Sequence, residues 1–328
     1  DKPMTTKADA DALMEQGDKH LKNKTFLFKK SPEYDKAADC FQKAAQIYRS
    51  PLVKAFDQAI AAFERAAEAH SSGGVHYNAA TALESAGNIL RDNKDVRKAA
   101  SFYKRASDMY KRCDNVEKSC DATIKAAKAV SDEDVDQAII YYLDAIEQYV
   151  SEEKHIFVGD TWRTCLNLMV RNRKLDEAVK LLEKMFSVFE KLEQADYLHK
   201  AQLSVVVIKL SKGDVGGAAK SCDSYGDFAM EEEGCAAREL LDAFEAGDVD
   251  AIKTLTAKQI FTLLENQVAR LAARLKDVCT EQEEDLTGAR ESSAGRGGRS
   301  AAGAKVFQLS ELDDSLPSAK GGGGGGGG

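Results

Sequence analysis

The sequence predicts an all-α fold in which helical hairpins stack on one another, and three observations carry this prediction. Positions 52–316 contain no proline, although the chain has 4 prolines in its 328 residues. Proline in a helix interior costs about 3 kcal/mol, so this long stretch permits helix after helix. No segment of it alternates apolar and polar residues with the period of two that half-buried strands show. The third observation is a repeat.

The repeat is marked by an alanine that recurs, after a first step of 22 residues, at intervals of 39 or 40 residues. Large, small and large residues follow it at offsets of 4, 7 and 11, positions that lie on one face of a helix. Small residues let a neighbouring helix approach closely, and the rings fill the remaining space. The anchors are Ala37, Ala59, Ala99, Ala138, Ala178 and Ala218, and the residues at offset 11 include Tyr48, His70, Tyr110 and Tyr149.

A step near 40 residues accommodates two helices of about 15 residues with their turns. Partner helices with their own apolar spacing are expected around residues 75–90, 120–124 and 162–169. Such hairpins bury their apolar faces by stacking, so we expect a right-handed α-solenoid similar to tetratricopeptide (TPR) repeats, though with a longer repeat. We expect the TPR-like solenoid over residues 1–230, a C-terminal helical cap over 231–280, and a disordered acidic, then glycine-rich tail over 281–328.

Composition argues against several classes of function. The 46 basic and 54 acidic residues give a net charge of −8, which speaks against a general nucleic-acid binder. No apolar run approaches the roughly 20 residues of a spanning helix, and residues 1–4 lack the apolar core of a signal peptide, so a cytoplasmic location is expected. The 7 cysteines include no Cys-x-x-Cys pair and are expected to be reduced packing residues.

We find no residue pattern that indicates catalysis. The 5 histidines are scattered, without the spacing of a metal site. The segment 213–221 is rich in glycine but lacks the Gly-Lys-Ser/Thr ending of a phosphate loop, and no strand precedes it. His70 occupies a ring position of the repeat, which favours packing. We therefore expect no enzyme activity, no cofactor and no metal.

One loop combines rings with basic residues and is a candidate membrane contact. It contains Phe26, Leu27 and Phe28, followed by Lys29 and Lys30. Each ring that enters a bilayer interface could contribute about 1.5–3 kcal/mol, and each lysine beside anionic lipid about 1 kcal/mol. The alternative is that the rings fold back onto the first hairpin.

Two stretches, 22–48 and 235–252, resemble soluble NSF attachment proteins (SNAPs), most closely the gamma type. The resemblance implies an adaptor that coats an assembled SNARE four-helix bundle, such as a syntaxin-type complex, and recruits and stimulates the hexameric ATPase NSF, which disassembles the bundle in vesicle fusion. It implies a cytoplasmic protein peripheral to the cytosolic face of vesicle, Golgi or endosomal membranes. The family's membrane loop maps onto Phe26, Leu27 and Phe28.

The resemblance also implies two protein contacts. Basic residues on the inner face of the solenoid would meet the acidic SNARE surface, and candidates are Lys118, Lys125, Lys128, Arg163, Arg171 and Lys200. An acidic patch followed by leucine would engage NSF, and the chain has two such segments. The first contains Glu283, Glu284, Asp285 and Leu286, and the second contains Asp313, Asp314 and Leu316. Both are followed by further residues, unlike the family's ending.

A second function remains open from the residues alone. A TPR-like scaffold could bind the peptide tails of partner proteins in its groove, without NSF or SNAREs. A groove lined by lysine and asparagine near the tops of the hairpins would favour this alternative.

Overall fold

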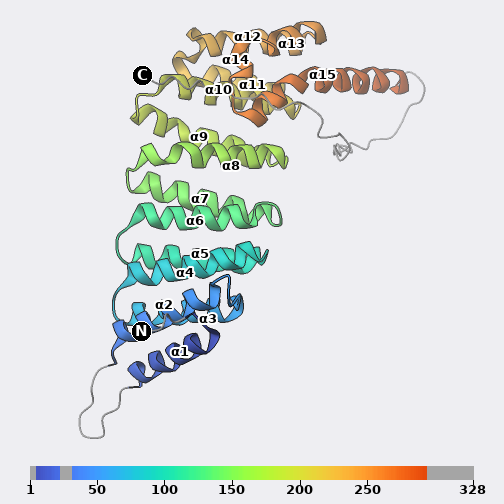
Figure 1. Cartoon of the computed structure of the whole chain (residues 1–328). Coiled ribbons are helices and arrows are strands. Elements are labelled where there is room, and N and C mark those ends of the chain that lie inside the picture. The colour runs from blue at the N-terminus through green and yellow to red at the C-terminus, as the bar shows by residue number, and fades with distance from the viewer. Residues whose placement is uncertain (1–4, 23–31, 294–328) are drawn as a thin grey trace, which may run out of the picture. The chain divides into compact units, whose positions relative to one another are not determined.

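The computed structural model describes residues 5–22 and 32–293, with side chains up to residue 280. The described elements are all helical, and α1 to α11 pack in chain order, each on its predecessor (Figure 1). The all-α solenoid is thereby confirmed. The stack consists of α1 (Lys7–Leu21), α2 (Tyr34–Arg49), α3 (Phe56–Ser72), α4 (His76–Asp92), α5 (Val96–Lys111), α6 (Val116–Val130), α7 (Val135–Ser151), α8 (Gly159–Arg171), α9 (Leu175–Lys191), α10 (Ala195–Ser211) and α11 (Val215–Ser224).

The predicted repeat stripe is buried along the whole stack. The first two anchor alanines lie on α2 and α3, and the later ones on α5, α7, α9 and α11, so the step of 22 residues advances one helix. All six anchors are buried, and for the first five anchors so are the residues at offsets 4, 7 and 11, whereas after Ala218 the stripe ends, with Tyr225 partly buried and Ala229 exposed. His70 is 5% exposed, which confirms its packing role. The stripe therefore forms the contact between successive helices.

The turns show that each repeat consists of two halves of equal length. Gly74, Lys94 and Asp114 have positive φ angles and are spaced 20 residues apart, and Arg173 and Glu193 continue the spacing after α8. The N–H of the following residue donates back to a carbonyl in the last helical turn, as from Asp95 to Leu90 at 2.9 Å. This bond satisfies a carbonyl that the helix end leaves without a partner.

At two positions of the stripe, a helix can approach its neighbour closely because a glycine of one helix faces a ring of the next. A Cβ added at Gly17 would lie 2.4 Å from the ring of Phe41, and one at Gly87 would lie 2.8 Å from the ring of Tyr103. These two rings, both at offset 4, thus pack directly on glycine backbone of the preceding helix.

The buried side chains form two clusters of different composition. The cluster that spans α1 to α6 consists mostly of alanine with aromatic rings, whereas the cluster towards the C-terminus is richer in leucine, valine and isoleucine. From Ala201 to Ile208 helix α10 is buried on all sides, because α9, α11 and α12 pack around it. Its residues Val205 to Ile208 are the strongest apolar run in the sequence, and full burial explains that run.

The helices after the stack are α12 (Glu232–Glu245), α13 (Val249–Thr256), α14 (Gln259–Thr262) and α15 (Asn266–Ser293). Helix α12 packs on α10 and α11, and the described residues up to Glu283 belong to one compact unit that continues across the expected division at 230. Helix α15 continues past residue 280, after which the composition predicts a disordered tail. Residues 281–293 contain no proline and several helix formers, such as Leu286, which allows the helix to continue.

Candidate functional site

The candidate SNARE-contact residues lie on three alternate helices. Lys118, Lys125 and Lys128 are on α6, Arg163 and Arg171 on α8, and Lys200 on α10. Ion pairs connect helices two apart along the chain, from α1 to α3 to α5 to α7 to α9 and from α4 to α6. Alternate helices therefore lie side by side, and α6, α8 and α10 belong to one layer of the stack.

The lysines of α6 differ in how much of their charge is compensated. Lys125 donates to Glu84 of α4 at 2.9 Å, and Glu84 also accepts a bond from Tyr110 at 3.4 Å. Lys118 lies 3.9 Å from Asp121 on its own helix. Lys128 is exposed in the last turn and has no ion-pair partner among the described residues. Lys128 thus presents a charge without a partner, and the charge of the exposed Lys118 is only weakly compensated.

Ion pairs between repeats also use much of the charge on the other layer. Arg105 pairs with Glu64, and Lys104 pairs with Asp144, which also accepts from the amide of Gln148. Burial acts to raise the pKa of Asp144, but Lys104 and Gln148 outweigh burial and hold that pKa below its usual range. The many charges of the sequence therefore serve partly to hold one repeat against the next.

Three side chains form a polar stripe along α8. Arg163, Asn167 and Arg171 are spaced four residues apart, so they lie on one face of the helix. The Arg163 guanidinium is 3.1 Å from Glu265 and 3.5 Å from Asp160, and it lies 5.1 Å from the ring centroid of Tyr197. Arg163, a candidate for binding an acidic partner, thus already has acidic partners within the chain.

Asn167 was not identified from the sequence, yet it connects two distant parts of the chain. Its Oδ1 accepts the backbone N–H of Gln267 at 2.9 Å, across 100 residues. Gln267 lies in the first turn of α15, where backbone N–H groups have no partner within the helix. The stripe spacing could have pointed to Asn167, because it lies midway between Arg163 and Arg171, but its partner could not be found that way.

A polar groove of about 400 Å³ lies along this stripe. Arg171 borders it with its side chain 58% exposed, and its nearest carboxylate, on Asp132, is 4.0 Å away. The other polar residues of the groove are Ser131, Thr164, Asn167, Asn266 and Gln267. The groove thus offers side-chain amides and an arginine whose charge is only weakly compensated.

Lys200 lies on α10, directly before the buried part of that helix. Its side chain is half-buried, and the residues that follow it from Ala201 to Ile208 are buried. The structure therefore places Lys200 at the margin of the layer, whereas Lys128 and Arg171 are exposed.

Cys120, Cys165 and His70 are packed in the core, whereas Cys113 and Cys235 are exposed. Burial raises the pKa of the Cys120 and Cys165 thiols to about 12, so they stay protonated at neutral pH. Burial also lowers the pKa of His70, which favours the neutral ring. Within the described part of the chain, no group of three or more histidine, cysteine or acidic side chains could hold a metal ion.

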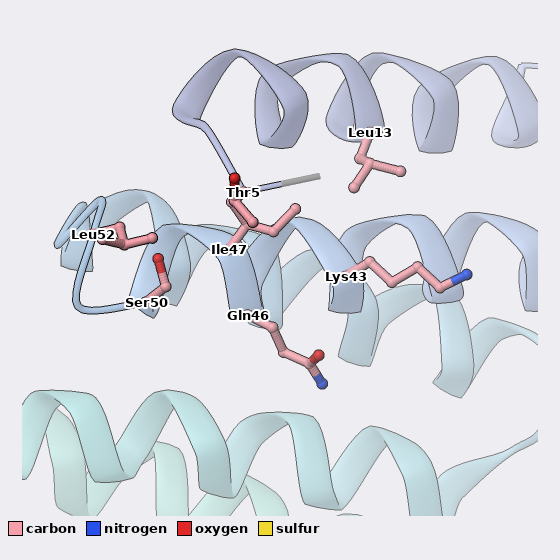
Figure 2. A pocket seen from close by; sticks show the side chains of 7 residues that line it. All are labelled: Thr5, Leu13, Lys43, Gln46, Ile47, Ser50 and Leu52. Carbon is pink, nitrogen blue, oxygen red and sulfur yellow. The ribbon is translucent and has the colours of Figure 1, made fainter. Parts of the chain in front are cut away.

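A second cavity, of about 350 Å³, lies between α1 and α2 at the N-terminal end of the stack. Figure 2 shows Leu13 reaching down from α1 beside Ile47 of α2, with the amine of Lys43 directed away from Ser50. Leu52, 82% exposed, borders the cavity. The cavity is mostly apolar and carries no arrangement of groups for catalysis.

Several candidate residues lie outside what the structure describes. The loop residues Phe26, Leu27, Phe28, Lys29 and Lys30 fall outside the described ranges, as do Asp313, Asp314 and Leu316 of the second acidic segment. Glu283, Glu284, Asp285 and Leu286 lie on the backbone of α15, whose side chains are not described there. No described helix is both long and apolar enough to cross a bilayer.

The chain is similar in sequence to one family of known proteins. The family described as "Soluble NSF attachment protein, SNAP" matches residues 8–262. The chain is 34% identical over 272 residues to a gamma-soluble NSF attachment protein of Dictyostelium discoideum, covering 82% of this chain and 83% of that one. It is 26% identical over 271 residues to a gamma-soluble NSF attachment protein of Arabidopsis thaliana, covering 82% of this chain and 92% of that protein.

Among solved structures, the chain is similar to a Rap protein complexed with competence and sporulation factor. The TM-score is 0.34 and the sequence identity 18%, over 90% of this chain and 79% of that one. This likeness is too distant to bear on function. The family match over residues 8–262 and the two gamma-type relatives establish that the chain belongs to the soluble NSF attachment protein family.

Proposed function

We propose that this chain is a non-enzymatic adaptor of vesicle-mediated transport, which binds assembled SNARE complexes and recruits and stimulates the NSF ATPase that takes them apart. The observation that carries the proposal is the family match over residues 8–262, which covers the whole helical stack. The described fold supports it, because a stack of rigid hairpins offers a long continuous surface to a helical partner.

The SNARE bundle would contact the layer formed by α6, α8 and α10. Within that layer Lys128 and Arg171 are exposed, whereas Lys125 and Arg163 are paired with glutamates. A basic surface favours encounter with an acidic partner and orients it, with a strong dependence on salt. Lys128 and Arg171 should therefore contribute more to SNARE binding than their paired neighbours.

The test is charge reversal on the two layers. Lys128→Glu with Arg171→Glu should weaken binding to a SNARE bundle without transmembrane segments by about tenfold or more at low salt. Lys180→Glu with Lys191→Glu, on exposed positions of α9 in the other layer, reverses the same number of charges as the matched control and should change affinity little. Titration of each variant with labelled bundle measures both effects. Equal losses in the two layers would contradict the proposed surface.

The loop with Phe26, Leu27 and Phe28 would attach the adaptor to the membrane beside Lys29 and Lys30. Attachment by one loop is weak and reversible, so its effect should appear where several adaptors act on one bundle. Phe26→Ser with Phe28→Ser should lower SNARE disassembly on liposomes far more than disassembly in detergent. Equal loss in both assays would indicate that the rings pack against the first hairpin instead.

The acidic and leucine residues of the C-terminal region would engage NSF. Two variants separate the segments: truncation after Ser293 removes Asp313, Asp314 and Leu316, whereas Glu283→Gln with Glu284→Gln and Asp285→Asn neutralises the first segment. The variant that removes the true contact should keep SNARE binding and reduce stimulation of the ATPase. Full stimulation by both variants would move the contact into α12 to α14.

The groove on α8 keeps the peptide-scaffold alternative testable. Asn167, Asn266 and Gln267 are the kind of side chains that bind a peptide backbone, although no lysine borders the groove. An adaptor of SNARE bundles should bind the assembled bundle much more tightly than any of its separate, unfolded strands. Equal affinity for an unfolded strand would favour the alternative.

A further inference from the structure

Helix α8 holds the beginning of α15 from two adjacent positions of its polar stripe. Glu265 directly precedes α15, and its carbonyl accepts the N–H of Ala269 at 2.9 Å, so Glu265 is the N-cap residue of that helix. Its carboxylate is 3.1 Å from Arg163 Nε. Four residues along α8, Asn167 accepts the N–H of Gln267 at 2.9 Å. One ion pair and one hydrogen bond therefore tie the first turn of α15 to α8.

These two contacts are of the kinds that contribute most at a helix end. The ion pair is partly shielded from water, with the Arg163 and Glu265 side chains 33% and 26% exposed. A partly buried ion pair is screened by water and salt less than a fully exposed one. The Asn167 bond gives a partner to an N–H that the first turn of a helix leaves free, a role usually filled by a residue of the same segment.

The rest of α15 is held by apolar packing. Val268, Ala272, Leu275 and Cys279 are buried in the C-terminal cluster. Loss of the Arg163 contact would thus loosen the first turn without releasing the helix. The response of α15 to events on α8 should be local, and it can be measured at single amides.

Arg163 already divides its N–H groups between two carboxylates of the chain, so a carboxylate of a bound partner would compete with them. Arg163 lies on the same stripe as Arg171, on the layer that would contact the SNARE bundle, and its fork of N–H groups is already directed at Glu265 and Asp160. A carboxylate brought to this stripe by a bound partner competes with Glu265 for the same guanidinium. Contact of Arg163 with that carboxylate would replace its contact with Glu265.

We propose that Arg163 couples partner binding on α8 to the first turn of α15: an acidic helical partner on α8 replaces Glu265 at Arg163 and thereby loosens that turn. The proposal rests on the proposed SNARE-binding function. Beyond that function, partner binding on the stack would change the stability of the first turn of α15, the helix that also carries the acidic segment Glu283 to Leu286. By thermodynamic linkage, a change that frees Arg163 from Glu265 must in turn strengthen binding of the partner.

The first measurement uses the free full-length chain. Glu265→Gln removes the ionised partner of Arg163 with almost no change in shape, and hydrogen exchange at Gln267 and Ala269 should accelerate by about tenfold. Glu239→Gln is the matched control, because it removes the same charge from an ion pair with Lys258 at 2.7 Å that does not involve α8. Unchanged exchange in Glu265→Gln would overturn the proposed restraint.

The second measurement adds an assembled SNARE bundle without transmembrane segments. In the unmodified chain the bundle should accelerate exchange at Gln267 and Ala269. Glu265→Gln should bind the bundle about fivefold more tightly than the unmodified chain, and Glu239→Gln within about twofold of it. Equal affinities of the two variants, or slower exchange at Gln267 in the complex, would overturn the coupling. Failure of the unmodified chain to bind the bundle would instead refute the proposed function.

Discussion

Helices α1 to α7 and the helices from α8 onward bury their apolar faces through different kinds of contact. From α1 to α7 each helix contacts its neighbours in the chain, through an alanine and ring stripe and ion pairs between successive repeats. From α8 onward, the greater part of α10 is enclosed on all sides, and α15 returns to α8 across 100 residues. The first region is built from contacts that recur with the repeat, and the second from contacts that occur once.

This difference determines how each region should respond to damage. In a stack of repeats, stability is a sum over repeats and their nearest neighbours, so a defect opens the structure locally. Where distant segments share one buried helix, a defect should open them together.

Deletion of one core side chain in each region is the most severe comparison. Tyr103→Ala on α5 and Leu203→Ala on α10 both remove fully buried side chains, and each should cost about 3–5 kcal/mol. Hydrogen exchange should increase mainly in α4 to α6 for Tyr103→Ala, but from α8 through α15 for Leu203→Ala. Opening of the same helices by both substitutions would show that the two regions do not differ.

Addition of one methyl group tests the close approach of helices in the regular region. A Cβ at Gly87 would lie 2.8 Å from the buried ring of Tyr103, so Gly87→Ala should destabilise by about 1–3 kcal/mol. Gly216→Ala on α11 is the matched control, because its Cβ would meet nothing within 4 Å, and it should stabilise by up to about 1 kcal/mol. Urea unfolding measures both. A gain in stability for both variants would refute the packing account.

Loss of the hydrogen bond between Gln267 and Asn167 should have a smaller and local effect. Asn167→Ala removes the acceptor of the Gln267 N–H and should cost about 1 kcal/mol, seen as faster exchange at that amide. Asn172→Ala serves as the control, because its amide bonds only to Leu168 within the same chain segment, at 2.8 Å. If both variants leave Gln267 protected, the contact between α8 and α15 does not contribute to stability.

The smallest effect concerns pH in the regular region. Burial lowers the pKa of His70 in the folded chain, although Asp39 and Asp35 oppose the shift. The unfolded chain therefore binds a proton at higher pH than the folded one, so stability should fall as pH drops below about 6.5, until the folded pKa is passed. His70→Phe should reduce this slope between pH 7 and 5. An unchanged slope would place the pH dependence at other groups.

The regular region could be predicted from the sequence because its contacts follow from spacing. The anchors, the rings at offsets 4 and 11 and the partner helices all lie where the repeat placed them, and the burial of His70 followed from its position in the repeat. One helix of the stack resembles the next, so each repeat confirms the interpretation of the others. The fold class followed from the same regularity.

The contacts of the second region could not be predicted, because spacing carries no information about a segment that returns from far along the chain. Nothing in the sequence around Asn167 or Glu265 indicates that they lie near each other. The sequence likewise predicted Arg163 and Lys125 as basic contacts without their glutamate partners. A lysine or arginine is visible in a sequence, but whether its charge is compensated depends on the fold.

The measurement that tests the account most directly is retention of NSF, held in a non-hydrolysing state, on the immobilised full chain with and without an assembled SNARE bundle. The account predicts strong retention when the bundle is present and little without it, because the adaptor presents NSF with several copies gathered on one bundle. Equal retention with and without the bundle, or none in either case, would contradict the adaptor function.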